Sequence, residues 1–373
     1  MIKFENVIRN DASFFLNLIR VISVEMVLVG HIFWWSHKKD SLISIASFGV
    51  VLFFILSGIL ISNSLFSKNR DGNYSFGEYF MDRFARIYSG LAPCLLVVLL
   101  LDGVHLWLAS THYLKMENAV FSDQYSFRNF LGSLAMIQNI GVFPAPLRSL
   151  NIGYGFGTAR PLWSLAIEWW LYLAFGWAVL KWQMIKMAKV RYFFVLALFS
   201  IIPGCYLIFR GEFGGLILVW FLGVGITVLL NLLRGAGVRR STPFLYFGLF
   251  LVILSMVRFL AYFQEPYSLV TSILTLGGIF LIVHALSETR SVKAAGIVKS
   301  VDYIAAYSYT LYLIHMPIIL LLALYLKNNF LSYLVVSVVL SNGISALIAR
   351  WTEMKHKALS VWLKSKLAQA RTR

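Results

Sequence analysis

Charged side chains are scarce in this sequence, and acidic ones are scarcer than basic ones. Only 13% of the 373 residues are charged, 59% are hydrophobic, and the mean hydropathy is +0.76. A soluble domain of this length would carry roughly twice that charged fraction. The scarcity of charge therefore excludes a soluble globular protein.

Cysteine is also nearly absent from the chain. Cys94 and Cys205 are the two cysteines, and both lie in apolar segments. Two such residues provide neither a disulfide framework nor a cluster of metal ligands. Internal repeats, low-complexity tracts and a soluble domain are missing from the sequence as well. We therefore expect one membrane domain with no bound metal or cofactor.

Long apolar runs recur along the chain, each close to the ~20 residues that cross a bilayer core. We expect ten membrane-spanning helices, at 15–35, 42–65, 87–107, 162–180, 192–209, 213–233, 243–263, 267–287, 303–326 and 329–349. The fold class predicted is an all-α polytopic membrane protein, a bundle of about ten transmembrane helices. It would form a single domain over 1–350, with an outer loop over 108–161 and a basic cytoplasmic tail over 351–373.

The basic residues explain the topology. The chain has 33 Lys and Arg against 16 Asp and Glu, a net charge of +17. Most of the basic residues fall on the membrane side that both termini share. Because cytoplasmic loops carry the excess of Lys and Arg, we expect the N and C termini to be cytoplasmic. No nucleic-acid partner is then needed, and the basic tail is expected to lie on anionic lipid at the inner surface.

One apolar stretch in the outer loop, 127–143, would reverse the topology of everything after it if it crossed the membrane. The downstream basic residues would then lie almost entirely outside. We therefore expect 127–143 to be an interfacial or re-entrant helix.

Ionisable residues inside the spans are the first candidates for a site, because each is costly in hydrocarbon. Arg20 and His31 are eleven residues apart in the first span. On a helix this spacing places them on one face, within about 20° and about 16 Å apart along the axis. Glu25 lies on another face. Each residue alone has a simpler explanation: Arg20 would reach the inner headgroups, and His31 would be a polar anchor near the outer end of the span. Two on one face predict the lining of a polar cavity.

The fourth span, "RPLWSLAIEWWLYL" (160–173), contains Glu168 as its one carboxylate. Ser164 precedes it by four residues and shares its helix face. A carboxylate at this depth must be paired, protonated or hydrated. The alternatives are a structural pairing, for instance with Arg160, and a role in the site.

Two further stretches contain candidates. Arg83 and Arg86, in "EYFMDRFARIY" (78–88), lie three residues apart at the cytoplasmic side. Two guanidinium groups on one face suit phosphate, although arginine pairs that only set topology are common. His315, in "YSYTLYLIHMPI" (307–318), precedes Pro317, where a kink is expected. Taken alone, His315 is a satisfied residue of the bundle.

Five stretches in this order resemble the acyltransferase family 3 membrane proteins, which include O-acetyltransferases of bacterial cell-surface polysaccharides and of nodulation factors. They are the pair Arg20 and His31, "FFILSGILI", "RFARIY", "PLWSLAIEWWLY" and "YSYTLYLIH". Together they extend over 20–315. The family's arginine motif often opens with another basic residue, where this chain has Asp82.

The resemblance implies a membrane O-acyltransferase that moves an acyl group, usually acetyl, from acyl-CoA to a hydroxyl. It implies that His31 is the essential histidine, with Arg20 as its partner and Glu168 as the acid of the fourth-span motif. Arg83 and Arg86, together with Arg20, would hold the acyl-CoA donor.

Three other residues in these motifs, Trp163, Ser164 and His315, are assigned to the acceptor. The expected partners are acyl-CoA as donor substrate, a glycan or lipid-linked sugar as acceptor, and membrane lipid. The expected location is the bacterial cytoplasmic (inner) membrane, with acceptor transfer at the outer face.

Two mechanisms of acyl transfer remain open, and one other class of protein competes with the acyltransferase interpretation. His31 is the span residue suited to act as a general base at neutral pH, with Glu168 orienting its ring. The alternative is a covalent relay in which the imidazole carries the acetyl group. The competing class is a transporter or flippase for a polar or anionic substrate, because ionisable residues in spans also mark transport routes. Transporters more often show duplicated halves, and none are visible here.

Overall fold

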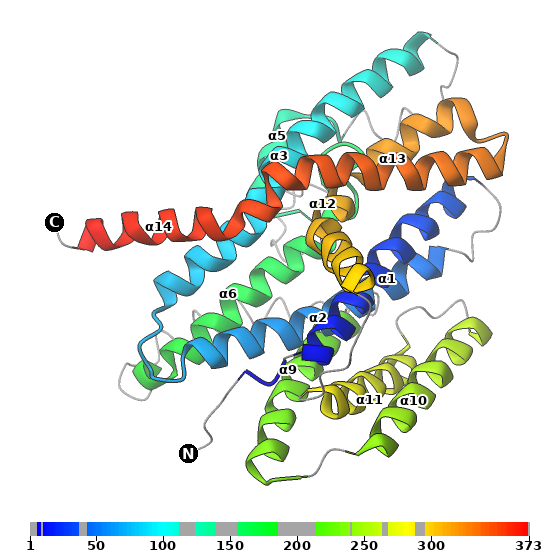
Figure 1. Ribbon diagram of the computed structural model, residues 1–373. Helices are drawn as coiled ribbons and strands as arrows, with labels where there is room; N and C mark the ends of the chain where they lie inside the picture. The colour runs from blue at the N-terminus through cyan, green and yellow to red at the C-terminus, as the bar shows by residue number, and fades with distance from the viewer. Residues whose placement is uncertain are drawn as a thin grey trace. The chain divides into compact units, whose positions relative to one another are not determined.

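The computed structural model describes residues 6–8, 10–36, 43–111, 124–138, 155–185, 214–238, 241–262, 268–287 and 295–371. Over these ranges the regular secondary structure is entirely helical. The helices are α1 (Asn10–Trp35), α2 (Ile43–Lys68), α3 (Phe76–Thr111), α5 (Phe127–Leu134), α6 (Leu162–Ile185), α9 (Gly214–Gly235), α10 (Thr242–Ala261), α11 (Leu269–Leu286), α12 (Ala295–Leu326), α13 (Phe330–Trp351), the short 3₁₀ helix η4 (Glu353–Lys355) and α14 (His356–Arg371) (Figure 1).

Nine helices in the described part of the chain are long and apolar enough to cross a membrane. They correspond to nine of the predicted spans, and the remaining one, 192–209, lies outside the described residues. The predicted fold class, an all-α polytopic membrane protein, is therefore confirmed. The cytoplasmic placement of the termini and the boundaries of a single domain stay predictions.

Two helices extend well beyond the spans predicted from hydropathy. α3 begins at Phe76, about three turns before its predicted span, and α12 begins at Ala295, about two turns before its own. Hydropathy reports only the part of a helix that is soluble in hydrocarbon, whereas the backbone hydrogen bonds continue into the headgroup region. As a result, both arginines of the predicted donor motif lie within α3 rather than in a loop.

The outer stretch predicted as an interfacial or re-entrant helix is helical over Phe127–Leu134. Ser126 caps this helix, since its side chain accepts a hydrogen bond from the backbone N–H of Asn129. Eight residues span about 12 Å as a helix, far less than a bilayer core of about 30 Å. α5 by itself is therefore too short to cross. Residues 139–143 lie outside the described part.

The chain divides into two compact units. The first comprises Met1–Val27, Ser44–Phe76 and Gly176–Ala305, and the second comprises Leu28–Ile43, Gly77–Phe175 and Ala306–Arg373. The first division point lies within α1 and the last within α12. Each unit is described by itself below.

In the first unit, α2 and α9 cross at close range through two glycines. A Cβ on Gly58 would lie 2.1 Å from the backbone oxygen of Trp220, and one on Gly223 would lie 2.7 Å from that of Ile55. The indole Nε1 of Trp220 donates a hydrogen bond of 3.0 Å to the Ser57 hydroxyl. Ser57 and Gly58 interrupt the otherwise apolar stretch "FFILSGILI" (53–61). The close crossing of α2 and α9 explains why these two small residues stand there.

Also in the first unit, α10 and α11 run side by side (Figure 1). Several large apolar side chains of α10 point away from the protein, among them Phe250, Val257 and Leu260. A surface of this composition suits contact with lipid, because the hydrocarbon of the bilayer does not penalise it.

The second unit contains α13, which packs through small side chains. A fully buried stripe runs along it at every fourth position, through Tyr333, Ser337, Ser341, Ser345 and Ala349. The hydroxyl of Tyr333 donates to the backbone oxygen of Ile319 on α12. Small residues at this spacing allow close approach of helix backbones. This packing joins α13 to α12, the helix that contains His315.

Candidate active site

Two histidines meet in the second unit. His31, near the end of α1, and His315, in the middle of α12, contact each other with 3.0 Å between His31 Nδ1 and His315 Nε2. Their ring centroids are 5.1 Å apart and the planes are tilted by 33°. His315 is 1% exposed, and His31 is partly buried. The structure therefore brings a residue predicted as the base together with one that was assigned to the acceptor.

The helix on which His31 lies supports the spacing argument made from sequence. α1 runs unbroken from Asn10 to Trp35, so Arg20 and His31 lie on one face of a regular helix, about 16 Å apart along it. Arg20 belongs to the first unit and His31 to the second. The partnership of Arg20 with His31 in the site stays a prediction.

A group of hydroxyls adjoins the histidine pair. The hydroxyl of Tyr312 donates to the backbone oxygen of Pro161 at 2.8 Å, and lies 2.6 Å from the hydroxyl of Ser164. The Ser164 hydroxyl also lies 3.2 Å from the Pro161 oxygen, so the two hydroxyls and this carbonyl form one hydrogen-bonded group. The Tyr312 and His315 rings are 6.0 Å apart. These bonds join the start of α6 to α12 next to His315.

Sequence reasoning missed Tyr312. A signal was present, because Tyr312 precedes His315 by three residues and so lies on the same helix face. Ser164, which had been assigned to the acceptor, is buried and bonded to this tyrosine. Trp163 is its partly buried neighbour at the start of α6. The acceptor roles of Ser164 and Trp163 stay predictions.

Glu168 lies on α6, one turn after Ser164. Its Oε2 accepts a hydrogen bond of 3.2 Å from the hydroxyl of Tyr172, and the backbone oxygen of Tyr172 accepts one from Tyr79 on α3. The carboxylate is thus bonded within α6 to Tyr172, and the backbone of the same tyrosine joins α6 to α3. Its predicted role in orienting the His31 ring stays a prediction.

The two arginines of α3 have different surroundings. Nη1 of Arg86 forms an ion pair of 2.9 Å with Oε1 of Glu353, which is fully buried in η4. The other carboxylate oxygen of Glu353 accepts from the backbone N–H and the hydroxyl of Thr310, each at 2.9 Å. The Arg86 guanidinium lies 5.7 Å from the centre of the Tyr309 ring. Arg86 therefore ties α3 to α12 and η4.

Close packing of α12 on α3 keeps Tyr309 in this place. A Cβ on Gly90 would lie 2.7 Å from the Tyr309 ring, so α3 needs glycine there. The Tyr309 hydroxyl donates to the backbone oxygen of Ile87 at 3.2 Å. In the sequence "YSYT" (307–310), the ring of Tyr309 thus contacts Arg86, and the hydroxyl of Thr310 donates to Glu353, the carboxylate that pairs with Arg86.

Arg83 is more available than Arg86. Its guanidinium lies 5.7 Å from the ring of Tyr79, one turn earlier on α3. Its Nε is buried, and no hydrogen-bond acceptor reaches it within the described ranges. A buried donor without a partner is costly, and an anionic ligand would satisfy it. Arg83 therefore has a hydrogen-bond donor left for a phosphate, whereas one nitrogen of Arg86 is already paired with Glu353.

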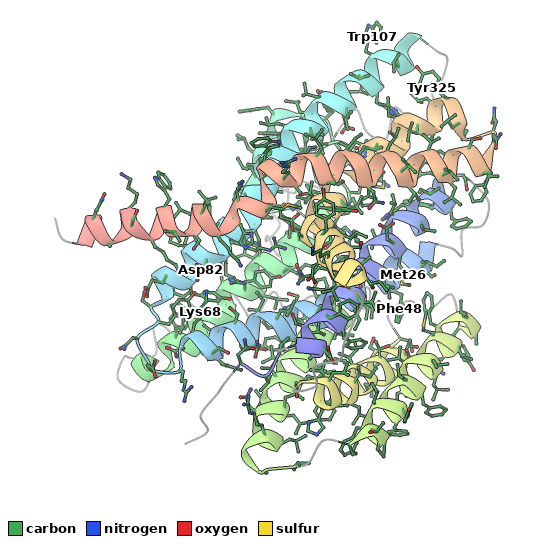
Figure 2. The ribbon with its side chains drawn as sticks, viewed as in Figure 1. Met26, Phe48, Lys68, Asp82, Trp107 and Tyr325 are labelled. Atoms are coloured by element: carbon green, nitrogen blue, oxygen red, sulfur yellow. The ribbon has the colours of Figure 1, made fainter. Side chains whose placement is uncertain are left out.

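Asp82 anchors the C-terminal helix. Asp82 is labelled in Figure 2. One of its carboxylate oxygens accepts a hydrogen bond from Ser360 and lies 2.7 Å from Nζ of Lys364, both on α14. Ser360 and Lys364 are four residues apart, which places them on one face of α14. The acidic residue that departs from the family's pattern therefore has partners on α14, and the segment predicted as a tail, 351–373, contains the fully buried Glu353.

A metal site is not evident among the residues that the structure describes, where no group of three His, Cys, Asp or Glu could hold an ion. The absence of a metal or cofactor in the working protein stays a prediction.

These features define a polytopic helical membrane protein. Its second unit contains the contacting pair His31 and His315, and α3 of the same unit contains Arg83 and Arg86. A comparison with known protein families matches residues 13–350 to an acyltransferase domain. The chain therefore belongs to acyltransferase family 3, and it is a membrane acyltransferase, as the resemblance of its motifs implied. No curated protein and no solved structure was found to match it.

Proposed function

We propose that this acyltransferase moves an acetyl group from cytoplasmic acetyl-CoA to a hydroxyl of a glycan or glycolipid at the outer face of the bacterial inner membrane. The observation that carries this proposal is the contact between partly buried His31 and buried His315 in a chain of the acyltransferase family. A histidine ring inside the bundle is the group best suited to take a proton from a hydroxyl at neutral pH.

The proposed reaction is a single displacement. The acceptor oxygen attacks the thioester carbonyl carbon while His31 takes its proton. The new C–O bond forms as the C–S bond breaks, and the proton passes to the sulfur, which gives the ester and free coenzyme A. In the covalent alternative, His31 attacks the thioester itself, and the acceptor hydroxyl then takes the acetyl group from the imidazole.

The donor is proposed to bind from the cytoplasmic side through its phosphates. Arg83 has a buried Nε without a hydrogen-bond acceptor among the described residues, which favours a phosphate ligand. Arg20 precedes His31 on α1 by about three helical turns. The thin pantetheine arm of coenzyme A is comparable in length to the ~16 Å between Arg20 and His31. A donor with its head near the inner surface would thereby present its thioester near His31. Glu168, Trp163 and Ser164 are proposed to complete the site from α6.

Loss of the Arg83 guanidinium should weaken donor binding. Arg83→Ala is expected to raise the Kd for coenzyme A about 10- to 100-fold, since a hydrogen bond to a charged group contributes about 1.5–3 kcal/mol. Arg83→Lys should recover part of the affinity, because it replaces a planar fork by a point charge. Binding of radiolabelled coenzyme A to the purified protein measures both.

The control for this prediction is Arg70→Ala, which removes an exposed arginine of the segment between α2 and α3. Its donor affinity should equal that of the unaltered protein. An unchanged affinity in Arg83→Ala would reduce Arg83 to a residue that only sets topology.

Transfer across the membrane is testable in sealed vesicles of known orientation. With labelled acetyl-CoA supplied only at the cytoplasmic side, we expect label on acceptor confined to the opposite side. The reason is that His31 lies about one turn before the end of the spanning helix α1, and Arg20 lies about 16 Å back along it, toward the end predicted to be cytoplasmic. Label solely on acceptor held at the cytoplasmic side would exclude an outer-face acceptor, while the acyltransferase assignment would stand. Vesicles containing His31→Ala provide the background.

A further inference from the structure

The ring of His315 makes contacts that fix its own protonation. Its Nδ1 lies 3.1 Å from the backbone oxygen of Leu311 and 2.9 Å from that of Tyr312. Carbonyl oxygens accept hydrogen bonds and cannot donate them. Nδ1 of His315 must therefore carry a proton, which it donates to the preceding turn of α12.

The opposite nitrogen of His315 is then an acceptor. The ring is 1% exposed, and a second proton would place a charge where desolvation is costly. In the neutral ring with a proton on Nδ1, Nε2 has a lone pair. Since Nε2 lies 3.0 Å from Nδ1 of His31, the proton of this hydrogen bond belongs to His31.

It follows that the tautomer of His31 is set as well. With its proton on Nδ1, neutral His31 has its lone pair on Nε2, the nitrogen that points away from this hydrogen bond. We propose that His315 is a positioning residue that holds His31 in the Nδ1-protonated form, so that Nε2 of His31 is the atom that meets the substrate. The structural part of this inference stands alone, and its catalytic consequence rests on the proposed function.

The same arrangement supports the transition state. When Nε2 of His31 takes the proton of the acceptor hydroxyl, the ring becomes an imidazolium, and its Nδ1–H still donates to neutral His315. A hydrogen bond to a charged donor is stronger than one between neutral groups, so the pair stabilises the charge as it develops. The proton then leaves Nε2 for the sulfur of coenzyme A. In the covalent alternative, the same Nε2 lone pair attacks the thioester.

The turn that holds His315 is itself braced. Tyr312 provides one of the two carbonyl oxygens, and its hydroxyl is bonded to Pro161 and Ser164 at the start of α6. Ile314 and Met316 on either side of His315 are buried. Backbone oxygens of α12 thus hold Nδ1 of the His315 ring, and Nε2 is the ring nitrogen that accepts a hydrogen bond.

Nitrogen NMR tests the tautomer directly. In protein labelled with ¹⁵N-histidine and placed in lipid bilayers, the signals of His31 are those lost in His31→Ala. We expect a protonated Nδ1 and an unprotonated Nε2 in the unaltered protein. Spectra in which His31 carries its proton on Nε2 would overturn the inference, whatever the activity.

Kinetics test the consequence. His315→Phe keeps a ring of similar size without an acceptor and is expected to lower kcat about 10- to 100-fold, as loss of an orienting partner does. The KM for acetyl-CoA should stay unchanged, because the proposed role of His315 acts through His31 and not through a contact with the donor. His315→Gln should recover part of kcat, since its amide oxygen accepts from Nδ1–H of His31.

The matched control is His284→Phe, which removes a buried histidine that contacts aromatic rings in the first unit. Its kcat should be unaltered. Full kcat in His315→Phe, with His31→Ala inactive, would overturn the positioning role while the proposed function stands. Full activity in His31→Ala would instead exclude His31 as the catalytic residue, and with it the catalytic consequence, while the NMR assignment of the tautomer decides the structural part. Absence of acetyl transfer in the unaltered protein would exclude the proposed function itself.

Discussion

His31→Ala is expected to abolish acetyl transfer while the protein remains abundant in the membrane. A general base contributes about 10²- to 10⁴-fold to a rate, and the covalent alternative loses its acyl carrier altogether. Folding should persist, because leaving the His315 acceptor unsatisfied costs about 1–3 kcal/mol. Transfer of labelled acetyl from acetyl-CoA by purified protein in lipid measures the loss, and immunoblotting measures the abundance.

The control for His31→Ala is His284→Ala, the same truncation of a histidine that is buried in the first unit. It should keep its transfer rate, so that a general effect of losing an imidazole is separated from the loss of the base. Activity in His31→Ala equal to that of the control would exclude both mechanisms.

Glu353→Ala is expected to have the largest effect on stability. The carboxylate is fully buried, pairs with Arg86, and accepts two hydrogen bonds from Thr310. Removing one partner of a buried ion pair costs about 3–5 kcal/mol, because it leaves an uncompensated charge. Arg86→Ala combined with Glu353→Ala should be less destabilised than Glu353→Ala alone, since both charges are then gone.

Thermal unfolding with a thiol-reactive dye measures this, because Cys94 is buried and reacts on unfolding. A Cys205→Ser background makes Cys94 the sole reporter. Asp71→Ala, at an exposed carboxylate, should leave the midpoint unchanged. A Glu353→Ala midpoint equal to that of Asp71→Ala would show that the ion pair contributes nothing to folding.

The membrane class and most of the spans could be predicted from sequence because they depend on local properties. A run of about 20 apolar residues crosses a bilayer whatever its neighbours are. The helix ends were harder to place. Residues 76–86 of α3 are helical without being apolar, since that part of the helix need not lie in hydrocarbon.

The sequence also placed Arg20 and His31 on one helix face, because the period of a helix is a property of the backbone alone. It could not pair His31 with His315, since no local pattern joins residues 284 positions apart. Taken alone, His315 was indistinguishable from any satisfied histidine of a bundle. Contact between α1 and α12 gave it a partner, because Nε2 of His315 lies against Nδ1 of His31.

For the arginines, the sequence determined that two guanidinium groups lie three residues apart on one helix, and it gave them equal roles. Only the tertiary structure separated them, by packing buried Glu353 against Arg86 and leaving Nε of Arg83 without an acceptor within the described residues. The physical reason is that desolvation and pairing of a charge depend on which side chains surround it, and helices distant in sequence supply those side chains.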